Sequence, residues 1–123
     1  MATNATWTVI FDDKMIIKQS GDAAGPYTIT GEDSFWSDSK WSNIWAIQYG
    51  TSPSSDEVEY RDETAHTSWT DANLGDFSTQ FIAKWDAAHL TQLQALWDND
   101  NVDGETESEK ITRLGARPTS YSS

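Results

Sequence analysis

The sequence predicts an α+β protein: an antiparallel sheet of about five strands with C-terminal helices packed on one of its faces. In the first half of the chain, short runs rich in β-branched and aromatic residues are separated by Gly-, Pro- and Asp-rich turns. After residue 76 the apolar residues instead recur at steps of three and four, which is typical of a helix. The sheet is therefore expected over roughly residues 6–61 and the helices over roughly residues 76–97.

The N-terminal part predicts a β-hairpin and a third strand. Residues 7–11 and 15–18 are two β-rich runs, and the short Asp-containing segment 12–14 between them is a natural turn. A loop of Gly, Asp and Pro follows at residues 20–26, and residues 27–30 resemble a short third strand.

The most strand-like run of the chain is Ile44–Tyr49, which we expect to be the middle strand. Strict alternation would place Ile44, Ala46 and Gln48 on one face and Trp45, Ile47 and Tyr49 on the other, so that both faces are largely apolar. Residues 57–61 alternate between apolar and charged side chains, which suits an edge strand.

The helical region carries an apolar stripe formed by Phe77, Phe81, Trp85 and Ala88, which continues into a Leu-rich segment ending at Trp97. The sheet is the only large apolar face available to cover this stripe, so residues 1–97 are expected to form one domain. Residues 98–123 are expected to be an acidic linker and C-terminal segment. Within it, residues 109–114 would form one or two helical turns, and residues 119–123 a loose polar tail.

Composition narrows the class of function. The chain has 123 residues, no cysteine, and 20 acidic against 8 basic residues, for a net charge of −12. This charge disfavours direct binding to nucleic acid or to an anionic membrane surface. No apolar run is long enough to span a bilayer, and the N-terminus lacks signal-peptide features, so a soluble protein made in the cytosol is expected.

An Asp/Asn cluster is the sharpest metal candidate. Asn99, Asn101, Asp103 and Gly104 match positions one, three, five and six of an EF-hand calcium loop. The match fails at position twelve, where Lys110 stands in place of the bidentate glutamate. A solvated turn contains the same residue types, so no cofactor is expected.

The sequence carries no catalytic signature, and we expect a protein that is not an enzyme. His66 and His89 fall in no metalloprotease pattern, and no Gly-x-Ser-x-Gly motif supports a serine triad. A small hydrolase with paired carboxylates is the outside alternative. An acidic mimic of nucleic acid ranks low, because the acidic residues are scattered.

Seven tryptophans suggest a different alternative, a carbohydrate-binding or host-adhesion module. Trp36, Trp41 and Trp69 lie in loop-like stretches, where exposed rings would stack on a saccharide. The competing interpretation, which we favour, is that these rings cap the ends of the core.

Three segments, at residues 7–19 (WTVIFDDKMIIKQ), 42–50 (SNIWAIQYG) and 56–62 (DEVEYRD), give the chain its one family resemblance. It resembles small uncharacterised proteins encoded among the structural genes of tailed phages, those of marine cyanobacteria above all. The resemblance implies a virion component: a head decoration, or a tail, neck, fibre or baseplate accessory. Its partners would be other virion proteins and further copies of itself.

The C-terminal segment supplies the contact residues for such an assembly. Residues 113–121 are expected to contribute to an intersubunit contact, with Arg113, Leu114, Arg117 and Tyr121 as the interaction candidates.

Overall fold

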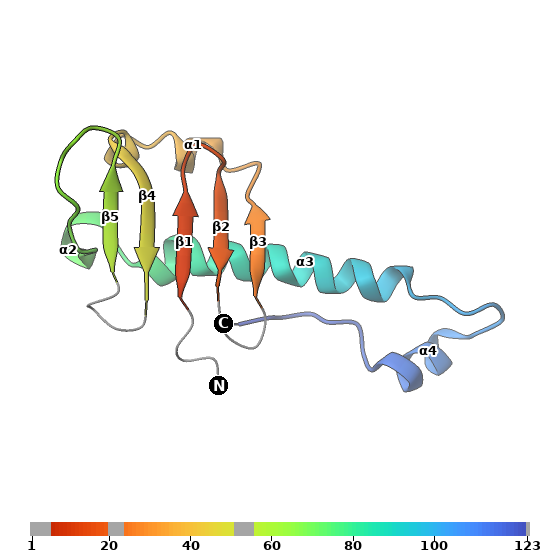
Figure 1. Ribbon diagram of the computed structural model, residues 1–123. Helices are drawn as coiled ribbons and strands as arrows, with labels where there is room; N and C mark the ends of the chain where they lie inside the picture. The colour runs from red at the N-terminus through yellow and green to blue at the C-terminus, as the bar shows by residue number, and fades with distance from the viewer. Residues whose placement is uncertain (1–5, 20–23, 51–55, 123) are drawn as a thin grey trace. The chain divides into compact units, whose positions relative to one another are not determined.

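The computed structural model describes residues 6–19, 24–50 and 56–122 and confirms the α+β class (Figure 1). The chain forms two compact units, residues 1–85 and 86–123. The sequence placed the end of the domain at residue 97, whereas the structure divides at Trp85 and Asp86, inside the long helix α3 (Ala83–Asn99).

The first unit contains a five-stranded sheet in which every neighbouring pair is antiparallel. The strand order is β3-β2-β1-β4-β5, as Figure 1 shows. The strands are β1 (Trp7–Ile10), β2 (Met15–Lys18), β3 (Gly25–Thr28), β4 (Ile44–Tyr49) and β5 (Glu57–Tyr60). The third strand thus begins two residues before its expected start at Tyr27.

The predicted hairpin joins β1 and β2. Lys14 adopts a left-handed conformation with φ 51° and donates its backbone N–H to the Phe11 carbonyl at 3.2 Å. This closes the tight turn over residues 12–14 and sets the register in which Val9 faces Ile16.

The expected middle strand is an interior strand but not the middle one. Val9 pairs with Ile16 on one side and with Ile47 on the other, so β1 occupies the centre and β4 lies next to it. Strand β5 is one of the two edge strands, as expected, and a bridge between Val58 and Thr67 covers part of its free edge.

A β-bulge overturns the expected alternation along β4. Ile44 pairs with Tyr60 while Ala46 pairs with Glu59, so the register shifts by one residue between them. Ile44 therefore lies on the same face as Ile47, and Trp45 at the bulge is left 42% exposed.

The remaining helical elements of the first unit are short. They are α1 (Asp33–Trp36), the 3₁₀ turn η1 (Ser39–Trp41), α2 (Asp71–Leu74) and the π-helical segment η3 (Ser78–Ile82) that leads into α3. Among the described helices, none has the length and apolarity needed to cross a membrane.

Aromatic rings fill the core of this unit. The fully buried Phe81 lies 4.9 Å from Phe77 and 5.4 Å from both Phe35 and Trp41, measured between ring centroids. The first part of the predicted stripe is confirmed, because Phe77, Phe81 and Trp85 are all buried, whereas Ala88 is only partly buried and Leu96 is 58% exposed. Trp85 packs edge-on against Trp7 of β1 at 5.5 Å, and its indole N–H donates to the Gly25 carbonyl at 2.8 Å.

Truncating Phe81 to Ala should lower the free energy of unfolding by about 3–5 kcal/mol, because the cavity would lie at the centre of the aromatic cluster. The matched control Leu96→Ala removes an exposed apolar side chain and should change stability by less than about 0.5 kcal/mol. Urea denaturation of both variants measures the difference. Equal effects would contradict a central role for Phe81.

Candidate functional site

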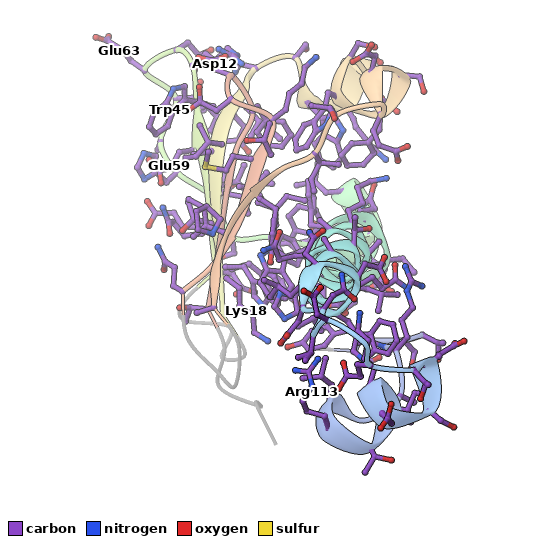
Figure 2. The ribbon with its side chains drawn as sticks, turned by 90° about the vertical axis from the view of Figure 1, so that its right-hand side faces the viewer. Asp12, Lys18, Trp45, Glu59, Glu63 and Arg113 are labelled. Carbon is purple, nitrogen blue, oxygen red and sulfur yellow. The ribbon has the colours of Figure 1, made fainter. Side chains whose placement is uncertain are left out.

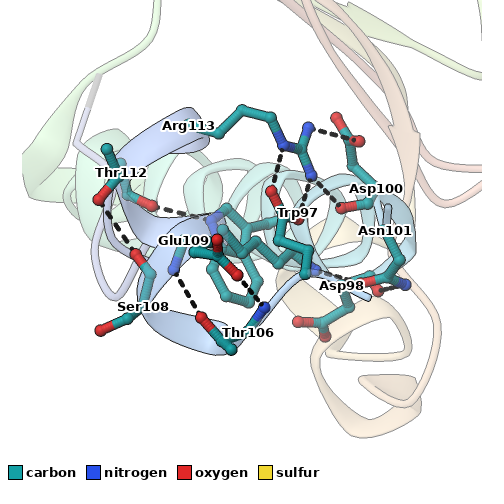
Figure 3. Close-up of polar contacts among 12 residues, drawn as sticks. Trp97, Asp98, Asp100, Asn101, Thr106, Ser108, Glu109, Thr112 and Arg113 are labelled. Carbon is teal, nitrogen blue, oxygen red and sulfur yellow. Dashed lines mark hydrogen bonds and ion pairs between the residues drawn. The ribbon is translucent and has the colours of Figure 1, made fainter. Parts of the chain in front are cut away.

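The acidic segment at residues 98–106 is tied to helix α4 (Glu107–Leu114), which begins two residues before the helical turns expected from residue 109. A capping box explains the earlier start. The Thr106 hydroxyl accepts the Glu109 backbone N–H at 3.2 Å, and the Glu109 carboxylate accepts the Thr106 backbone N–H at 2.9 Å (Figure 3). These two bonds satisfy donors that a helix start otherwise leaves unpaired.

Arg113 of α4 holds the acidic segment in place. Its guanidinium grips both Glu105 oxygens at 2.8 Å, donates to an Asp100 carboxylate oxygen at 3.0 Å and donates to the Asp100 carbonyl at 3.1 Å. Arg117 makes a similar two-point contact with Asp98, at 2.8 and 2.9 Å. Such fork-shaped pairs are the geometry for which arginine is best suited. We call Asp98, Asp100, Glu105, Arg113 and Arg117 the C-terminal clamp.

The clamp shifts the ionisation of its members. The hydrogen bond from Arg113 lowers the pKa of Glu105, and the hydrogen bond from Arg117 lowers the pKa of Asp98. In return, Glu105 and Asp100 raise the pKa of Arg113 above its usual range. The charges of the clamp are therefore engaged with one another. Arg113 and Arg117, both interaction candidates, are exposed but are paired within their own unit.

Lys110 is the buried cation of this unit. Its ammonium donates to Asn101 Oδ1 at 2.7 Å and lies 4.0 Å from the centre of the Trp97 ring. The Trp97 indole N–H in turn donates to the Gly115 carbonyl at 3.0 Å. In the sequence, Lys110 stood out only because it replaces the glutamate that an EF-hand loop would need to bind calcium. The burial of a lysine on a helix rich in charged residues has no simple sequence signal.

The candidate calcium loop is occupied by the protein's own groups. Asn99 is the last residue of α3, Asp103 is exposed in the following turn, and the Asn101 side-chain oxygen is bonded to Lys110. Within the described ranges, no group of three or more acidic or histidine side chains is placed to hold a metal. Lys110 and Arg113 thus supply the positive charge that a bound cation would bring to an EF-hand loop.

A shallow pocket of about 310 Å³ opens beside Trp97, Val102 and Lys110. Its polar walls include Asn101, bonded to Lys110, and Glu105, bonded to Arg113. These groups are already committed to holding the unit together.

The three tryptophans proposed as a saccharide platform are buried: Trp36 is 9% exposed, Trp41 2% and Trp69 7%. The Trp36 indole donates to the Ile29 carbonyl at 3.0 Å, and the Trp41 and Trp69 rings stack at 6.3 Å. Their ring faces pack in the core, as the competing interpretation predicted, and are not available to a sugar. The tryptophan that is exposed is Trp45, which sequence alternation did not single out because the bulge cannot be read from it.

The C-terminal tail is held along α3 rather than loose. Gln94 donates to the Pro118 carbonyl at 2.9 Å, and the half-buried Tyr121 packs edge-on against His89 at 4.5 Å. The other histidine, His66, pairs with Glu57 in the first unit. Of the interaction candidates, Leu114 alone keeps an exposed apolar side chain, at 36%.

Compared with family models, with curated proteins and with solved structures, the chain gives no match. The functional argument therefore depends on the residues and their geometry.

The clamp should make the C-terminal unit sensitive to acid. A carboxylate whose folded pKa lies below its unfolded value of about 4 contributes stability above that value and loses it as the pH falls through the folded pKa. Acidification should therefore loosen α4. In Arg113→Gln, the pKa of Glu105 should return towards its ordinary value, as a carboxyl-detected NMR titration would measure. The control Arg61→Gln, which removes the partner of Asp12 in the first unit, should leave Glu105 unchanged. An identical Glu105 titration in wild type and Arg113→Gln would contradict the clamp.

Calcium should not bind to the segment at residues 98–110. A cation there would have to displace both Lys110 from Asn101 and Arg113 from Glu105. Calorimetric titration to about 1 mM calcium, the range of weak extracellular modules, should give no binding heat. A saturable heat that disappears in Asp103→Ala would show that the loop is a calcium site after all.

Proposed function

We propose that the protein is a non-enzymatic structural or assembly protein of a tailed-phage particle, made in the host cytoplasm and incorporated into the virion. Its position would be that of a head decoration or of a tail, neck or fibre accessory. The resemblance of residues 7–19, 42–50 and 56–62 to phage structural-region proteins supplies this context. The surface of the C-terminal unit supplies the physical argument.

The observation that carries the proposal is the orientation of α4. This helix buries the charged Lys110 at 8% exposure and leaves Ile111 41% and Leu114 36% exposed. A surface helix ordinarily does the reverse, turning its apolar side chains inward and its charges outward. A helix with apolar residues on its solvent side is suited to a contact with another protein surface.

Exposed apolar side chains are concentrated in this unit. Of the five large apolar residues that are exposed in the described part of the chain, four lie in the C-terminal unit and one, Trp45, in the sheet unit. The four are Leu96, Val102, Ile111 and Leu114. The clamp and the capping box fix α4 before any partner arrives, so little conformational entropy would be lost on docking.

A second copy of the chain is the partner that the apolar side of α4 favours. Glu107 and Glu109 lie in its first turn and Arg113 in its last turn. Arg113 is already bonded to Glu105 and Asp100 and Glu109 to Thr106, so these charges are engaged within the chain. A two-fold axis would then bring Ile111 and Leu114 of two copies together. Homo-oligomerisation through Ile111 and Leu114 is therefore the assembly step that we propose.

In the double variant Ile111→Ser/Leu114→Ser, the purified protein should shift from an oligomer to a monomer, because the apolar contact surface is lost. Light scattering coupled to size exclusion measures the mass. The control Ser108→Ala/Thr112→Ala alters the polar side of the same helix and should leave the mass unchanged. Circular dichroism verifies that both variants stay folded.

A wild-type chain that is monomeric at high concentration would contradict the self-contact. The particle assignment is tested separately by mass spectrometry of purified virions of the encoding phage, which should contain the protein in a fixed copy number. Absence from the virion would overturn that assignment. Removing residues 115–123, which include the Arg117 and Pro118 anchors, should reduce incorporation; full incorporation would count against a role for the tail.

A further inference from the structure

The sheet of the first unit has a second face that the described helices of that unit leave uncovered. Figure 2 shows Trp45 and Glu59 on one side of the strands and α1, with the aromatic core, on the other. The strand register agrees, because Val9, Ile16 and Ile47 face the core and their strand neighbours point the opposite way. We call this second side the outer face.

The outer face has an apolar centre. Ile10 lies between Met15 on β2 and Ala46 on β4, and Thr8 similarly faces Ile17. Ile10, Met15 and Ile17 are only partly buried, although each sits within a strand pair. Trp45, lifted by the bulge, adds the one exposed tryptophan ring of the described residues at 42% exposure.

Acidic side chains surround this centre. Glu57 and Glu59 project from β5, with Glu59 directly opposite Ala46, and Asp12 and Glu63 lie at the Trp45 end of the sheet in Figure 2. Arg61 neutralises Asp12 at 2.6 Å, Glu57 is hydrogen-bonded to His66, and Glu59 accepts a hydrogen bond from Gln48 at 3.4 Å. The carboxylates of β5 and of Glu63 therefore supply the negative charge of this rim. The face therefore combines an apolar patch around Ile10 and Trp45 with the polar pair Thr8 and Gln48 and an acidic rim.

We propose that the outer face is a docking surface for a different protein, one that presents an apolar patch bordered by lysine or arginine. Charge complementarity leads to this partner: a basic rim would meet Glu59 and Glu63 while apolar side chains cover Trp45 and Ile10. A second copy of this chain is disfavoured, because face-to-face pairing would bring two acidic rims together. The inference is independent of the α4 contact, which lies in the other unit and joins like chains.

A matched set of synthetic peptides tests the surface with the full-length protein. The first peptide alternates leucine and lysine, the second leucine and glutamate, and the third serine and lysine. The leucine–lysine peptide should bind, as measured by calorimetry, and should bind at least about ten-fold more tightly than either control. If the serine–lysine peptide bound as tightly as the leucine–lysine peptide, net charge alone would explain the affinity and the proposal would be overturned.

Variants locate the site. Trp45→Ser and Glu59→Lys should each weaken binding of the leucine–lysine peptide by about ten-fold or more. Asp103→Lys changes the net charge equally but lies in the C-terminal unit, and it should leave the affinity nearly unchanged. Because the Glu59 side chain is partly exposed, Glu59→Lys should stay folded, and it still tests the surface if Trp45→Ser unfolds. Equal weakening by Asp103→Lys would overturn the proposal.

Two further outcomes would also overturn the proposal, because they would show that the outer face binds something other than a basic protein. Light scattering that shows a dimer lost in Trp45→Ser would identify the outer face as a self-contact. Binding to a glycan array that is lost in Trp45→Ser would identify it as a saccharide platform centred on a different tryptophan from those that the sequence suggested.

Discussion

The packing of aromatic rings between the sheet and residues 77–85 is the constraint on which the first unit depends. Four of its five strands are four residues long, so each can turn only about two side chains towards the core. Aliphatic residues at so few positions would bury little apolar area, whereas an aromatic side chain buries about 150–250 Å². Phe77, Phe81 and Trp85 meet this need from one helical stripe. Rings from the connections, Trp36, Trp41 and Trp69, close the same core, which is why they are unavailable as a binding platform.

The strands, the hairpin and the start of the helical stripe were predictable from the spacing of apolar residues. Alternation along a strand and recurrence every three or four residues along a helix both depend only on residues that are close in the sequence. Strand order does not depend on such residues alone. Ile44–Tyr49 is the longest of the five strands, yet β1 lies in the middle because its two edges pair with β2 and β4. The bulge at Trp45 is likewise invisible in the sequence, since it depends on pairing with Glu59 and Tyr60. One inserted residue moves Ile44 to the core face and leaves Trp45 exposed.

The C-terminal unit shows the same limit for a candidate site. Spacing correctly identified a loop rich in oxygen-bearing side chains between two helices, but spacing alone could not tell which cation neutralises it. The answer comes from α4, whose register brings Lys110 to Asn101 and Arg113 to Glu105. The capping box at Thr106 and Glu109 fixes where that helix starts and therefore which of its side chains turn inward. Because Lys110 faces inward, Ile111 and Leu114 remain on the solvent side.

The two apolar surfaces differ in the charges around them, and this difference bears on how the chain avoids wrong contacts. A net charge of −12 keeps separate copies apart at long range and so opposes indiscriminate association. On α4 the Arg113 charge is neutralised within the chain by Glu105 and Asp100, so the proposed contact with a like chain would depend on the apolar side chains of Ile111 and Leu114. On the outer face Glu59 and Glu63 are not balanced in this way, which penalises a like chain and favours a basic partner. Apolar area would then supply affinity at both surfaces, while the arrangement of charge selects which protein each one accepts.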